Sequence, residues 1–82
     1  MTTEEQNENR FKYYRNYTDE ELLKTRDDLI NDIAEYEDKL ADYSVSSYEK
    51  SEIENDGLPL ANDQLAYVEG LIKERRLAPA LR

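Results

Sequence analysis

The residues best placed to take part in chemistry are a set of carboxylates on one predicted helix. Five acids follow one another at spacings of 4, 3, 3 and 4, which places them along one side of a helix. Carboxylates displayed in this way attract a cationic surface, and they can occupy a groove that normally holds nucleic-acid phosphates. This acidic face consists of Asp28, Asp32, Glu35, Asp38 and Asp42.

The overall charge favours a partner of opposite sign. The chain has 20 acids against 11 bases, and the stretch 19–69 alone has 16 acids and 4 bases. A protein that binds nucleic acid directly needs the reverse balance, so we expect another protein with a basic surface as the partner. The simpler interpretation is a solvated face that keeps a small protein soluble.

A second set of residues precedes the helix and combines aromatic rings with bases. It holds four of the eight aromatic residues of the chain and no acid. Tyrosine and arginine are enriched in binding hot spots, and rings beside bases can also hold a nucleotide or an anion. The structural alternative is a segment laid across the helices, with Phe11 and Tyr14 in the core and the bases paired with acids. The basic-aromatic segment consists of Arg10, Phe11, Lys12, Tyr13, Tyr14, Arg15 and Tyr17.

Apart from its carboxylates, the sequence has few residues that could support catalysis or metal binding. The chain has no cysteine and no histidine, so disulfides, thiolate metal sites and the commonest general base are excluded. Acids around Gly57, from Glu52 to Asp63, match the spacing of a calcium-binding EF-hand loop only loosely, because Pro59 interrupts it. We therefore predict no enzymatic activity, no catalytic residue, no metal site and no cofactor.

One long helix must position the acidic face. Thr18 followed by Glu21 is a capping box, which predicts a helix over about 19–43. Apolar residues then recur at heptad spacing, interrupted once by Arg26, whose long side chain we expect to reach Asp63 or Glu69. We call these residues the heptad seam and predict that they drive self-association: Leu22, Leu29, Ile33, Tyr36, Leu40 and Tyr43.

The remaining sequence predicts a second helix that folds back on the first. Ser47 is a candidate cap for a short connecting helix over 48–55 that ends at a left-handed Gly57, and Pro59 suits the start of a helix over about 59–77. The fold class is therefore all-α, an antiparallel helical hairpin completed by oligomerisation. We predict a disordered polar lead over 1–9 and a single helical domain over 10–82. Four further apolar residues widen the first helix's stripe, so it should face more than one neighbour: Leu23, Ile30, Ala34 and Ala41.

These features predict a small acidic protein-binding module that works in the cytoplasm of a cell or of an infected host. No apolar leader or membrane segment is visible in the sequence. In size and composition alone, the chain resembles the small acidic helical proteins with which viruses and plasmids block host machinery. Two alternatives remain: an oligomeric binder of a nucleotide or another anion, with phosphates held by the basic-aromatic segment or by Lys73, Arg75 and Arg76, and a structural assembly protein.

Overall fold

The computed structural model describes residues 3–77 of the protein. Every regular element in that range is helical, which confirms the all-α class. The elements are α1 (Thr3–Phe11), the 3-10 helix η1 (Lys12–Asn16), α2 (Asp19–Ala41), α3 (Ser47–Glu52), the π-helical turn η2 (Ile53–Gly57) and α4 (Leu58–Glu74).

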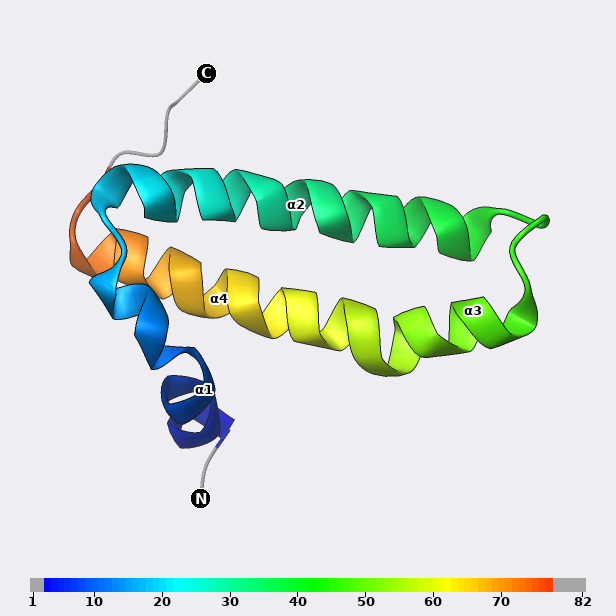
Figure 1. Ribbon diagram of the computed structural model, residues 1–82, viewed down its shortest axis with the longest axis horizontal. Helices are drawn as coiled ribbons and strands as arrows, with labels where there is room; N and C mark the ends of the chain where they lie inside the picture. Colours follow the sequence, from blue (N-terminus) through cyan, green and yellow to red (C-terminus); the bar gives the residue numbers. More distant parts are fainter. Residues whose placement is uncertain (1–2, 78–82) are drawn as a thin grey trace.

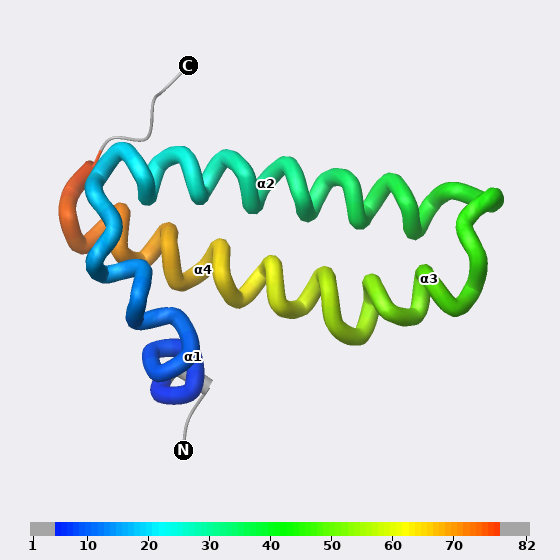
Figure 2. The backbone as a smooth tube through the Cα atoms, in the orientation of Figure 1, coloured from blue at the N-terminus to red at the C-terminus, as the bar shows by residue number. Residues whose placement is uncertain are grey.

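The helices form a single layer. In Figures 1 and 2, α2 and α4 run side by side in opposite directions, α3 returns the chain at one end, and α1 lies beside α4. The molecule measures 41 × 38 × 15 Å along its principal axes. Because a helix with its side chains is about 10–12 Å across, the shortest dimension holds one layer only. The broad faces of α2 and α4 are therefore not covered by further helices of the described chain.

The start of α2 follows the predicted capping box. The Glu21 amide donates to Thr18 Oγ1 at 3.1 Å, and the Thr18 amide donates to Glu21 Oε1 at 2.8 Å. The helix ends at Ala41 rather than at Tyr43, because the Asp42 carboxylate accepts hydrogen bonds from both the amide and the hydroxyl of Ser44. These bonds turn the chain out of the helix.

The connection to α4 differs from the prediction. Ser46, one residue before the expected Ser47, caps α3 by accepting from the Glu49 amide at 3.2 Å. Gly57 has φ −65°, a right-handed helical value, so the predicted left-handed stop is wrong and the chain stays helical from Ser47 to Glu74. The acids of the EF-hand-like spacing consequently lie on helix and cannot wrap around an ion.

Close packing explains the glycine at position 57. A Cβ atom built there would lie 3.2 Å from Cζ of the Tyr36 ring. Glycine therefore lets the π-helical turn approach α2.

The second helix ends three residues before the predicted position. Arg76 has φ 57°, the Arg76 amide donates to the Lys73 carbonyl, and the Leu77 amide donates to the Ile72 carbonyl, both at 3.0 Å. This pattern is a Schellman motif, with arginine where glycine is usual. It directs Leu77 back against the core.

The core lies at the end of the layer where α2 begins and α4 ends. Leu22 and Val68 have no exposed surface. The other buried members of this cluster are Phe11, Tyr14, Leu29, Leu71 and Ile72.

The heptad seam packs mainly against other parts of the same chain. Leu22 and Leu29 are buried in the core, so they cannot also form the predicted self-association surface. Burial decreases along the rest of the seam: Ile33, Tyr36 and Leu40 are half-buried, and Tyr43 is 99% exposed.

The N-terminal region also differs from the prediction. Residues 3–9, expected to belong to a disordered lead, are part of α1, while residues 1 and 2 lie outside the described range. The sequence offered no apolar periodicity here. The helix is instead tied to the hairpin by Glu8, whose carboxylate accepts from Tyr67 on α4 at 2.8 Å.

Replacing Thr18 tests the capping box. Thr18→Ala removes the acceptor for the Glu21 amide, and we expect a loss of about 1 kcal/mol in the free energy of unfolding. For a domain of this size that lowers Tm by about 4–8 °C in thermal unfolding followed by circular dichroism. Thr25→Ala removes the same atoms inside α2 and should not produce a comparable loss. Equal losses in the two variants would contradict a specific capping role.

Candidate functional site

The five acids of the predicted acidic face lie on exposed positions along α2 and at its C-cap. From Asp28 to Asp42 the helix rises by about 21 Å, and the spacing keeps the carboxylates on a side turned away from Leu22 and Leu29. The structure therefore presents these acids together to solvent.

Two of the five carboxylates are already engaged. Asp28 accepts from Lys24 Nζ at 2.8 Å, a contact that raises the pKa of the lysine. Asp42 accepts from the backbone amide of Ser44 and then from its hydroxyl, and both bonds lower the pKa of Asp42. The other three make no ion pair within residues 3–77: Asp32, Glu35 and Asp38.

The basic-aromatic segment is mainly a structural element. Phe11 and Tyr14 are 3% and 5% exposed, which agrees with the alternative of a segment laid across the helices. The Tyr14 ring contacts those of Tyr13 and Tyr17 at centroid distances of 4.3 and 5.0 Å, and burial raises its pKa. Tyr13 remains 45% exposed and Lys12 is also exposed, so these two side chains are open to a partner.

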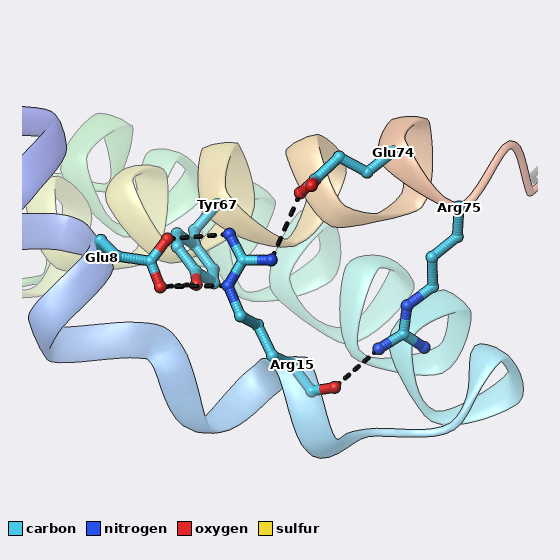
Figure 3. Close-up of polar contacts among 5 residues, drawn as sticks. All are labelled: Glu8, Arg15, Tyr67, Glu74 and Arg75. Carbon is cyan, nitrogen blue, oxygen red and sulfur yellow. Dashed lines mark hydrogen bonds and ion pairs between the residues drawn. The ribbon is translucent and has the colours of Figure 1, made fainter.

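Arg15 joins the segment to α1 and α4 (Figure 3). Its guanidinium donates from Nε and Nη2 to the two oxygens of Glu8 at 3.0 and 2.8 Å, while Nη1 lies 3.5 Å from Glu74. The group also lies 5.8 Å from the centre of the Tyr67 ring. Hydrogen bonds from Arg15 first, and then from Tyr67, lower the pKa of Glu8 to about 2.

Arg75 fastens the last turn of α4 to the chain that enters α2. Its Nη1 donates to the Tyr17 carbonyl at 2.7 Å and to Asp19 at 3.1 Å, and its Nη2 donates to the Arg15 carbonyl at 2.8 Å. The sequence analysis considered Arg75 only as a phosphate ligand. A basic residue at a helix end does not reveal which distant carbonyls it will reach.

Three of the six bases of the anion-binding alternative are thus engaged. Arg10 lies 3.9 Å from Asp63, Arg15 is held by Glu8, and Arg75 is held by two carbonyls. Within the described chain, Lys12 and Lys73 form no ion pair. A phosphate at the arginines would therefore have to compete with oxygens already bound to them.

Several shallow hollows open on the surface, and two of them have a volume of about 380 Å³ each. The one between α1 and α4 is lined by the side chains around Arg15, and the other lies between α2 and η2, beside Tyr36. Over residues 3–77, no three side chains of the metal-ligating types gather closely enough to hold an ion.

The hairpin tip was not recognised from the sequence. Tyr43 and Tyr48 are 99% and 75% exposed on either side of the turn between α2 and α3. Tyr43 fits the heptad spacing, but it lies beyond the end of α2 and therefore does not turn toward α4. Large exposed rings next to the acidic face are suitable anchors for a partner protein.

Comparisons with protein families, with characterised proteins and with solved structures find no match to this chain. None of the helices within residues 3–77 has the length and apolar character needed to cross a membrane.

The Glu8–Arg15 contact predicts a pH dependence of stability. The pKa of Glu8 is about 2 in the folded protein against an ordinary value of 4.5, so its charged form stabilises the fold above pH 4.5. That contribution decreases as the pH falls from 4.5 through 2. The Tm difference between the wild type and Glu8→Gln should be largest near pH 7, become small near pH 2 and vanish below it. Glu54→Gln, at an exposed position in η2, is the control. A difference that is independent of pH would refute the contact.

Proposed function

We propose that this protein is a non-enzymatic binding module whose acidic α2 face captures a basic surface of another protein. The observation that carries the proposal is the set of exposed carboxylates without an intramolecular ion pair, Asp32, Glu35 and Asp38. If the partner uses its basic surface to bind nucleic acid, occupation of that surface by the carboxylates inhibits it by mimicking phosphates.

Electrostatics supplies steering and selectivity rather than the full affinity. Each exposed ion pair contributes about 0.2–1 kcal/mol, so three pairs give at most about 3 kcal/mol. A millimolar complex already requires about 4 kcal/mol. Apolar anchors must contribute the rest, and Tyr43 and Tyr48 at the tip, next to Asp42, are the exposed rings in position to do so.

The anion-binding alternative has less support, because Arg10, Arg15 and Arg75 already contact carboxylate or carbonyl oxygens. The available carboxylates share one side of α2, whereas the bases without an ion pair among the described residues are divided between η1 and the end of α4: Lys12, Lys73 and Arg76.

The oligomeric state and the compartment of the protein are a second part of the proposed function. We propose that it acts as a homo-oligomer in the cytoplasm of a cell or of an infected host. A single layer of helices leaves apolar surface that a second subunit can cover. The absence of cysteine is compatible with a reducing compartment.

Neutralising the available acids tests the proposal. The triple variant Asp32→Asn, Glu35→Gln, Asp38→Asn removes three charges at nearly constant shape. The control Glu49→Gln, Glu52→Gln, Glu54→Gln removes three exposed charges from α3 and η2. Proteins captured from a host lysate by the wild type at low salt are identified, purified and titrated against all three chains.

We expect the α2 triple variant to bind about 3- to 100-fold more weakly and the control to bind within about 2-fold of the wild type. Duplex DNA or RNA should displace a partner that is captured by mimicry. Equal losses in both variants would mean that only net charge matters, and no loss in either would exclude the acidic face.

A further inference from the structure

One apolar side of α2 remains uncovered in the folded chain. It is formed by residues at spacings of 7, 4 and 7, which we call the outer stripe: Leu23, Ile30, Ala34 and Ala41. Ile30 is 38% exposed, Ala34 and Ala41 are exposed, and Leu23 is half-buried against the edge of the core. At about 100° per residue, the stripe points about a third of a turn away from the buried seam and about a third of a turn away from the centre of the acidic face.

The stripe borders an apolar strip on α4. Arg26 Nε lies 3.5 Å from Glu69, as the sequence analysis expected, and this pair marks where the two helices meet on that side. One turn further along each antiparallel helix come Ile30 on α2 and the half-buried Leu65 on α4. The uncovered apolar surface therefore extends over both helices.

The exposed area is large for the mass of the chain. A folded monomer of 9.7 kDa is expected to expose about 5,100 Å², whereas this protein exposes 6009 Å². A standard interface takes roughly 800 Å² from each partner, so a dimer contact of ordinary size needs about an eighth of the exposed surface.

The outer stripe is complementary to itself in the antiparallel direction. When two copies of α2 cross around a two-fold axis at the level of position 32, Leu23 faces Ala41 of the second copy, and Ile30 faces Ala34 of the second copy. Each large side chain meets a small one, which allows the helices to approach closely. A parallel arrangement would place Ile30 against Ile30 and alanine against alanine.

Charge is compatible with this arrangement. On one flank of the stripe, Arg26 of one copy approaches Glu37 of the second, which is an attractive pair. On the other flank, Asp27 approaches Asp38 of the second copy, but Asp27 is already paired with its own Arg26 at 3.3 Å. Of the acidic face, only Asp38 borders the contact, and its other four members point away, so two chains of net charge −9 can associate while they display most of those carboxylates outward.

We propose that a second copy of this chain covers the outer stripe and forms an antiparallel, two-fold symmetric dimer that displays two acidic faces outward. This inference specifies the homo-oligomer of the proposed function, and it can be tested without the protein partner.

Light scattering with size-exclusion chromatography at high salt measures the mass directly. The wild type should have twice the 9.7 kDa chain mass. Ile30→Lys should reduce it to the chain mass, whereas Leu60→Lys should not. Leu60 is the matched control for Ile30, because the two residues are 40% and 38% exposed. Ala34→Lys, at an exposed position without intramolecular burial, should also give the monomer with an unchanged circular dichroism spectrum.

A monomeric wild type at millimolar concentration would overturn the proposal. A dimer that survives Ile30→Lys and Ala34→Lys would keep self-association but exclude the outer stripe. Dissociation by Leu60→Lys alone would place the contact on another face.

The register has its own test, because the natural chain has no cysteine. Ala41→Cys alone should form no intermolecular disulfide, since the two sites lie 18 residues, or about 27 Å, apart in the antiparallel dimer. Mixed with Leu23→Cys, it should cross-link under mild oxidation. Cross-linking of Ala41→Cys with itself would show a parallel arrangement and contradict the proposed axis.

Discussion

The contact between α2 and α4 around Leu22 and Val68 is the interaction on which the other features of this protein depend. Both side chains are completely enclosed, and the buried cluster around them lies at one end of the layer. Two helices share one interface, so the chain can bury only one side of each. The buried side of α2 is the heptad seam, which leaves the acidic face and the outer stripe on its two other sides.

The N-terminal segment completes this contact. Phe11 and Tyr14 cover the end of the core, and Arg75 holds the entering chain by its Tyr17 and Arg15 carbonyls. Arg10 and Arg15 of the segment consequently serve the fold, and the larger surfaces open to partners lie on α2 and at the tip. Neutralising the acidic face and charging the outer stripe separate these roles, because neither change touches the core.

The sequence predicted those features that depend on local spacing. The capping box at Thr18, the apolar spacing that buries Leu22 and the contact of Arg26 with Glu69, one of its two expected acids, follow from local sequence spacing and side-chain reach. It did not predict features that depend on distant contacts. Gly57 is a close-packing residue because Tyr36 lies against it, α1 is tied down by Tyr67, and α2 stops when Asp42 binds Ser44. The acidic face could be located, but its partner could not, because carboxylates carry charge without specifying what they meet.

Native-state hydrogen exchange measured by NMR tests the central claim most directly. If one α2–α4 interface holds the fold together, the slowest amides should be those of 22–29 and 68–72, with free energies of opening close to that of global unfolding. Amides in the turn after α2 and in α3 should exchange at much lower cost. Uniform protection along α2, or the strongest protection at the tip, would contradict a fold that depends on the contact between Leu22 and Val68.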